Sequence, residues 1–142
     1  MQLNNFGSIL TFAEELEKND EAFFSAAGTN DDCTQHKDLF DQFVADLKKN
    51  QKNIQRTRRE NVTEMILEGI SDFSSDSYEL QHGGPEGMKV SEVMETARKL
   101  EERAVQYYED SAAKIKALPE VARELKMIAK KRKKHLDQLS DV

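Results

Sequence analysis

The sequence predicts an all-α protein that folds as a four-helix bundle. Three observations lead to this prediction: apolar residues recur at helical spacing, residues that break helices are few, and one half of the chain repeats the other. Hydrophobic residues make up 37% and charged residues 34%, with 2 Pro, 6 Gly and no Trp, which is typical of helices with charged outer faces. The length of 142 residues predicts a single domain, residues 1–142, with one buried core.

The internal repeat has a constant shift of 84 positions. The segments that it pairs are Ala13–Glu17 with Ala97–Glu101, Phe23–Phe24 with Tyr107–Tyr108, Lys48 with Arg132, and Gln51 with His135. One shift serves two blocks that are separated by unrelated residues. We therefore expect two copies of a helix pair, which together make a four-helix bundle.

The first hairpin is predicted over residues 5–61. Apolar residues recur every three or four positions from Phe6 to Ala27, which indicates an amphipathic helix. Gly28 ends this helix, and the acidic pair Asp31-Asp32 favours the start of the next one. The second helix is expected from Thr34 to Asn61, with an inner stripe made of Leu39, Phe40, Phe43, Val44, Leu47 and Ile54.

Residues 62–89 are predicted to form a crossover, because Ser, Asp, Gly and Pro interrupt the helical spacing there. Its first half, residues 65–70, is apolar, so we expect it to pack along the bundle as a short helix. The second hairpin is predicted over residues 90–140, with Ser91 as the N-cap of its first helix. Pro119 suits the first turn of its second helix. The three connections are therefore short, long and short.

Polar residues interrupt stripes that should be apolar. Glu17 lies in line with Leu10, Ala13 and Phe24, and Glu101 lies in line with Ala97, Ala104 and Tyr108. The other two helices bring Lys48 with Gln51 and Arg132 with His135 to the same level of the bundle. Each helix is therefore predicted to place one or two polar side chains in the core.

The segments Leu16–Phe24 and Leu100–Tyr108 resemble the glutamate-bearing helices of the rubrerythrin branch of the ferritin-like superfamily. This resemblance spans both hairpins and implies ferritin-like connectivity, with two antiparallel hairpins joined by a long crossover. The family holds two metal ions with one Glu from each of these helices and a Glu-x-x-His pair from each of the other two.

The metal-ligand pattern of the family is broken in this chain. Lys48–Gln51 and Arg132–His135 occupy the places of the two Glu-x-x-His pairs. Lys48 and Arg132 replace both carboxylates and Gln51 replaces one imidazole. Of six expected ligands, the remnant positions are Glu17, Glu101 and His135. We therefore expect the fold to carry over without the diiron chemistry, and no catalytic residue, cofactor or metal.

The replacement of carboxylates by Lys48 and Arg132 has a physical explanation. Two buried carboxylates without metal are costly to desolvate, and Lys48 and Arg132 would return positive charge to them. We expect Glu17, Lys48, Glu101 and Arg132 to form one interhelical cluster, with Gln51 and His135 at its edge. The alternative is that Lys48 and Arg132 extend out of the bundle into solvent.

Charge and composition narrow the functional classes. The net charge of −6 opposes general binding to nucleic acid, and the basic run Lys130–Lys134 is interpreted as a solvated helix face. No apolar stretch approaches the roughly 18 residues of a membrane span. The single cysteine, Cys33, and the lack of a signal-peptide pattern in the first 16 residues favour the cytoplasm.

Three functional hypotheses remain open at this point. The first is a non-catalytic binding or structural module that has lost its diiron centre and works as a homodimer, with no protein partner specified. The alternative is an iron or manganese oxidoreductase, or a peroxide-handling protein, in which Glu17, Glu101 and His135 hold metal with Glu14 as an auxiliary ligand. A third and weaker hypothesis is a nucleic-acid-associated protein.

Overall fold

The computed structural model describes residues 1–61, 69–115 and 117–142. Four long helices account for most of these residues, which confirms the predicted all-α class. They are α1 (Phe6–Gly28), α2 (Lys37–Glu60), α3 (Val90–Lys114) and α4 (Pro119–Ser140). Within the described residues, the connections contain three short 3-10 helices: η1 (Asp31–His36), η3 (Ser75–Tyr78) and η4 (Pro85–Gly87). No described helix is long and apolar enough to cross a membrane.

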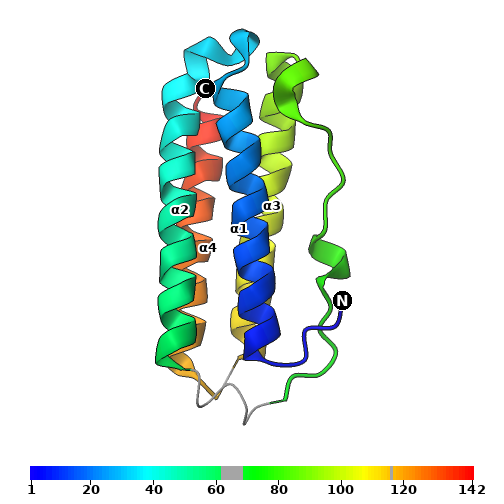
Figure 1. Cartoon of the computed structure of the whole chain (residues 1–142), viewed down its shortest axis with the longest axis vertical. Helices are drawn as coiled ribbons and strands as arrows, with labels where there is room; N and C mark the ends of the chain where they lie inside the picture. The colour runs from blue at the N-terminus through cyan, green and yellow to red at the C-terminus, as the bar shows by residue number, and fades with distance from the viewer. Residues whose placement is uncertain (62–68, 116) are drawn as a thin grey trace.

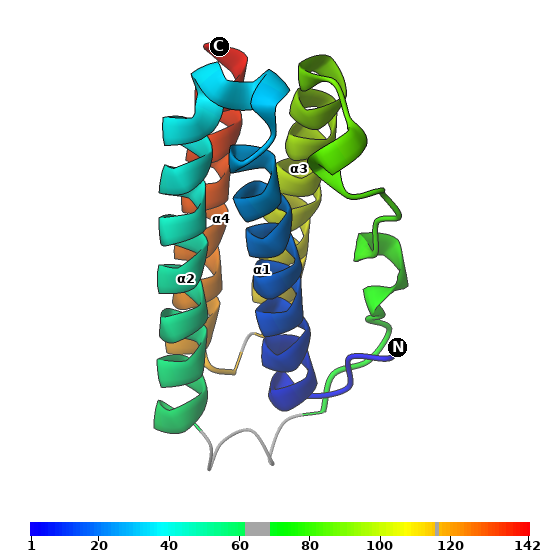
Figure 2. The same ribbon diagram turned by 45° about the horizontal axis from the view of Figure 1, so that its top comes forward.

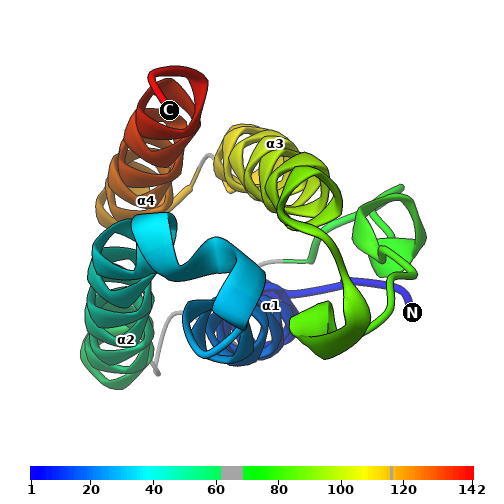
Figure 3. The same cartoon turned by 90° about the horizontal axis from the view of Figure 1, so that it is seen from above.

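The four helices lie side by side along the long axis of the molecule (Figure 1, Figure 2). α1 and α2 run in opposite directions, and so do α3 and α4. Seen from above, the helices occupy four corners, with α2 next to both α1 and α4 (Figure 3). Side-chain contacts agree with these directions, since Asn50 of α2 meets Glu17 while Arg58, further along α2, meets Thr11.

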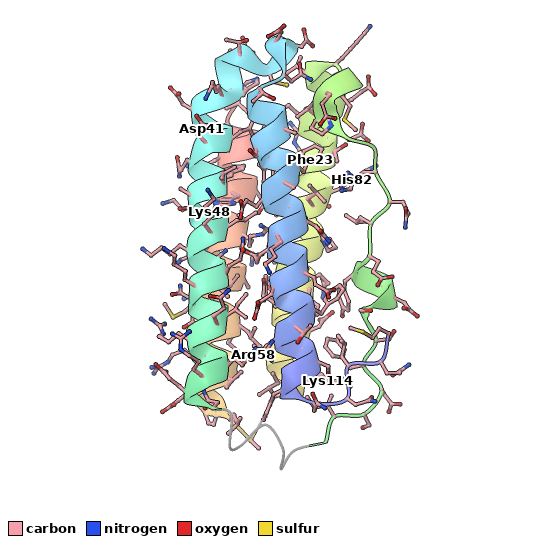
Figure 4. The ribbon with its side chains drawn as sticks, in the orientation of Figure 1. Phe23, Asp41, Lys48, Arg58, His82 and Lys114 are labelled. Atoms are coloured by element: carbon pink, nitrogen blue, oxygen red, sulfur yellow. The ribbon has the colours of Figure 1, made fainter. Side chains whose placement is uncertain are left out.

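The described part of the crossover between α2 and α3, residues 69–89, runs along the bundle on the outside of α1 and α3 (Figure 1). It pairs with the N-terminal segment, where the Leu3 N–H donates to the Phe73 carbonyl at 2.9 Å. The Tyr78 hydroxyl donates to Asp110 at 2.6 Å. His82 packs edge-on against Phe23 of α1, with ring centroids 5.3 Å apart (Figure 4). Most of the short helix expected over residues 65–70 lies outside the described residues.

The apolar core is divided into two clusters along the bundle axis. One surrounds the start of α1 and the junction between α3 and α4, and includes Phe6, Leu10, Tyr107, Leu125 and Ile128. The other surrounds the end of α1 and the start of α2 and α3, and includes Phe24, Phe40, Phe43, Ala97 and Leu139. A layer of buried polar residues lies between them: Glu17, Asp20, Asn50, Glu101, Arg132 and His135.

Two helix boundaries differ from the sequence prediction. α2 begins at Lys37 rather than Thr34, because Asp31–His36 forms η1. Ser91 is not the N-cap of α3: it lies inside the first turn, and Lys89 precedes the helix. The carboxylate of Asp32 accepts a hydrogen bond from the Val90 N–H at 2.7 Å. A side chain from the first hairpin thus satisfies one of the first N–H groups of α3, which have no partner within the helix.

The repeat has one register in α1 and α3 and another in α2 and α4. Buried positions of α1 recur in α3 with the expected shift of 84: Leu16, Glu17 and Phe24 recur as Leu100, Glu101 and Tyr108. At the start of the helices the buried Phe6 corresponds to the half-buried Val90. In α2 and α4 the buried positions recur with a shift of 85: Phe40 with Leu125, Phe43 with Ile128, Leu47 with Arg132, Asn50 with His135, and Ile54 with Leu139. The predicted alignment of the second block is therefore wrong by one residue.

Candidate functional site

The guanidinium of Arg132 lies at the centre of the polar layer and is fully buried. Its Nε lies 3.2 Å from Oε2 of Glu101, and its Nη1 lies 3.5 Å from Oε2 of Glu17. Its Nη2 donates to Oδ2 of Asp20. One cation on α4 therefore contacts three carboxylates, two from α1 and one from α3. Helical spacing explains the pair on α1, since residues three apart lie on one face.

Asp20 extends the layer toward the crossover. Its Oδ1 accepts from Nη2 of Arg103 at 2.5 Å, and only 10% of the Arg103 side chain is exposed. Arg103 also donates to the Tyr78 carbonyl at 3.2 Å. Asp20 and Arg103 were not among the predicted site residues. The signal for Asp20 was its position on the stripe of Ala13 and Glu17, three residues after Glu17.

His135 forms the other end of the layer. Its ring stacks on Phe43 with centroids 3.9 Å apart, and its Nδ1 lies 3.3 Å from Oε2 of Glu101. Its Nε2 lies 2.9 Å from Oδ2 of Asp46, a carboxylate whose side chain is 37% exposed. The imidazole therefore stands between a buried carboxylate and one that reaches solvent.

The polar residue that α2 contributes is Asn50. Its amide nitrogen donates to Oε1 of Glu17 at 2.7 Å, and the side chain is fully buried. Lys48, which we expected here, is exposed on α2 (Figure 4). Gln51 lies at the rim, where it donates to Glu21 at 2.7 Å. The one-residue slip in the alignment explains both errors, because Leu47 and Asn50 take the inward positions assigned to Lys48 and Gln51.

The predicted cluster is therefore confirmed for Glu17, Glu101, Arg132 and His135 and wrong for Lys48 and Gln51. The alternative that both cations extend outward is right for Lys48 and wrong for Arg132. The physical reason is direction: Arg132 follows Ile128 by four residues on the inner stripe of α4, whereas Lys48 follows the inner residue Leu47 by one. A step of one residue turns a side chain about 100° around a helix.

The residues of this layer do not fit a diiron centre. The guanidinium of Arg132 stands between Glu17 and Glu101, where a cation would have to contact both carboxylates. Within residues 1–61, 69–115 and 117–142, no three His, Cys, Asp or Glu side chains are arranged to hold a metal ion. Glu14, the auxiliary ligand of the alternative, pairs instead with Arg58, its Oε1 lying 3.4 Å from Nη2.

Charge in the layer is unevenly matched. Three buried carboxylates, Glu17, Asp20 and Glu101, face two guanidinium groups, Arg132 and Arg103. Burial raises the pKa of Glu17, although Arg132 and the amide of Asn50 oppose this effect. Burial alone would lower the pKa of Arg132, but the attraction of the three carboxylates outweighs it and raises the pKa. Arg132 therefore stays charged, and burial favours the neutral form of the Glu17 carboxyl.

Two further side chains, Cys33 and Tyr108, show no activation. Cys33 is buried at the start of the second cluster, and burial raises the pKa of its thiol. Tyr108 is buried beside Glu17, and burial raises the pKa of its hydroxyl well above the usual value. A neutral thiol and a neutral phenol are poor nucleophiles.

Comparisons with protein-family models, with curated proteins and with solved structures find no match to this chain. The resemblance to rubrerythrin-like proteins therefore stays a prediction that depends on this chain's own residues.

Replacing Arg132 by Leu should destabilise the protein by about 3–5 kcal/mol, because three buried carboxylates would lose their shared partner. Lys48→Leu is the matched control, and since Lys48 is exposed, we expect a change within about 0.5 kcal/mol. Urea unfolding followed by circular dichroism measures both. Equal effects of the two substitutions would contradict the burial of Arg132.

Glu17→Gln should make the folding stability of the protein less sensitive to a rise in pH. A carboxyl whose pKa is raised in the folded state contributes stability that is present at low pH and is lost as the pH rises through the folded pKa. The glutamine keeps the acceptor for Asn50 and carries no charge. Urea unfolding at several values between pH 5 and pH 8 measures this effect. The free energy of unfolding of the variant, relative to that of the wild type, should increase as the pH rises. A relative stability that decreases over this range would refute the assignment of the raised pKa to Glu17.

Proposed function

We propose that this chain is a ferritin-like, rubrerythrin-related bundle in which a buried arginine takes the place of the metal centre. In this proposal the protein is a non-catalytic binding or structural module. The observation that carries it is the position of Arg132, whose guanidinium contacts carboxylates from α1 and α3 in the middle of the bundle. A fixed cation there neutralises these carboxylates without a metal ion.

Two further features support the proposed family. The short, long and short connections and the helix directions (Figure 1) are those that ferritin-like proteins use. Glu17 and Glu101 occupy equivalent positions on α1 and α3, and Arg132 and His135 have the spacing of the family's Glu-x-x-His pair on α4. Arginine at the glutamate position reverses the charge that a metal site needs.

A groove between α1, α3 and the crossover gives the module a place to hold a small ligand. It measures about 350 Å³, and its walls include the apolar side chains of Phe12, Leu16 and Leu80. Asp20 and Arg103, the outer pair of the polar layer, also line it. A ligand in this groove would therefore contact the network that Arg132 organises.

The alternative function is metal-dependent redox or peroxide chemistry at Glu17, Glu101 and His135. Arg132 weighs against it, because its guanidinium repels a metal cation from all three residues. Glu14 is also committed to Arg58. We therefore favour the non-catalytic module over the iron or manganese enzyme.

The proposal includes a homodimer as the working form and a cytoplasmic location. Nucleic acid is not a proposed partner, since the excess of negative charge over the whole chain opposes it. No other protein partner is proposed.

Metal analysis tests the proposed loss of the metal centre. Protein produced with added iron and manganese, and then incubated anaerobically with excess of either ion, should contain far less than one metal ion per chain. Inductively coupled plasma mass spectrometry measures the content after gel filtration. Two bound metal ions per wild-type chain would favour the enzyme hypothesis instead.

Arg132→Ala is the matched variant for this test. It leaves Glu17, Asp20, Glu101 and His135 around the space of the lost guanidinium, and these are ligand types that manganese and iron accept. We expect the variant to bind Mn²⁺ more tightly than the wild type in isothermal titration calorimetry. Equal affinities would mean that Arg132 does not occupy the place of a metal.

A further inference from the structure

The outer surface that α3 and α4 share is free of any other described element. The crossover covers the opposite side of α3, next to α1 (Figure 3). We define the α3/α4 face by two stripes of residues spaced three or four apart. They are Arg98, Glu102, Val105 and Glu109 on α3, and Lys126, Ala129, Lys130, Lys133 and Asp137 on α4.

The centre of this face is shallow and apolar, and its rims are charged. A hollow of about 310 Å³ lies between the helices, lined by Ala129 and by the stems of lysines from α4. Val105 and Ala129 are small side chains in the seam, 9% and 5% exposed. The rim on α3 carries Glu109 and, toward the crossover, the exposed Glu102. The rim on α4 carries lysines. Small apolar residues between opposite charges suit close packing of another pair of helices.

Charges of opposite sign lie across the seam from each other on the two helices. Lys133 already pairs with Glu109 within the chain, its Nζ lying 3.5 Å from Oε1. Arg132 meets Glu101 in the core, so Lys133 and Glu102 lie within about one helical turn of each other along the bundle. Because α3 and α4 run in opposite directions (Figure 1), Arg98 lies near the height of Asp137.

We propose that the α3/α4 face binds the same face of a second copy of this chain, with a two-fold axis parallel to the bundle. This inference rests on the homodimer of the proposed function and identifies the interface of that dimer. Rotation about such an axis keeps every residue at its height and places α3 of one copy opposite α4 of the other. Glutamates of each α3 then face lysines of the other α4, and Arg98 faces Asp137.

The size of the α3/α4 face is sufficient for a stable dimer. α4 has 22 residues, which at ~1.5 Å per residue extend about 33 Å, and two helices side by side span roughly 20 Å. The product is on the order of 700 Å² per copy, close to the ~800 Å² per partner of standard interfaces.

The test is analytical ultracentrifugation of the full chain and of charge-reversed variants. The wild type should sediment as a dimer that weakens as salt increases, because the rim contacts are electrostatic. The double variant Lys130→Glu with Lys133→Glu should raise the dimer dissociation constant by more than about tenfold, and so should Glu102→Lys with Glu109→Lys. The quadruple variant, in which both rims are reversed, should dimerise again.

The charge-matched control is Lys48→Glu with Lys49→Glu on α2, which should leave the dimer unchanged. A dimer that resists both double reversals, or a quadruple variant that stays monomeric, would overturn this interface while the homodimer stands. A wild type that stays monomeric at concentrations of about 0.1 to 1 mM would overturn the dimer itself, because a dimer with a dissociation constant below the millimolar range would be populated there. Metal analysis is independent of this result, because it concerns the core of each chain.

Discussion

The buried guanidinium of Arg132 is the constraint on which the rest of the structure depends. It contacts Glu17, Asp20 and Glu101 between two separate apolar clusters. Three carboxylates in this position without a partner would cost several kcal/mol each to desolvate. Arg103 and Asn50 donate further hydrogen bonds to Asp20 and Glu17. The bundle can place acids at its centre because one residue of α4 brings the opposite charge to them.

This polar layer also fixes how the helices align. Apolar stripes tolerate sliding by a turn, since one aliphatic side chain packs nearly as well as the next. The contacts of Arg132 with α1 and α3 fit one register, because a shift of a turn would strand a buried charge. The same layer reaches the groove between α1, α3 and the crossover through Asp20 and Arg103 and reaches solvent through His135 and Asp46. The proposed binding at this groove and the alignment of the helices would therefore depend on one network.

Much of this arrangement follows from spacing alone. The apolar stripes predicted four helices, and polar residues on those stripes identified Glu17, Glu101, Arg132 and His135. Lys48 was misplaced because the repeat was aligned on the residues Lys48 and Arg132, which are chemically alike, rather than on buried positions. Asn50, four residues before the buried Ile54 and three after Leu47, continues the stripe of α2 and was the better choice. Asp46 and Arg103 lie at the edges of the buried faces of their helices. There, only packing against a neighbouring helix decides which polar side chains meet.

Nuclear magnetic resonance of the arginine side chains tests the central claim most directly. The Nε–H of Arg132, assigned by its loss in Arg132→Lys, is expected to give a resolved signal at pH 8. Its hydrogen exchange should be at least about a hundredfold slower than that of the exposed Arg59, because exchange of a buried, ion-paired group requires opening of the bundle. An Arg132 Nε–H that exchanges as fast as that of Arg59 would contradict the account, since it would place the guanidinium in water.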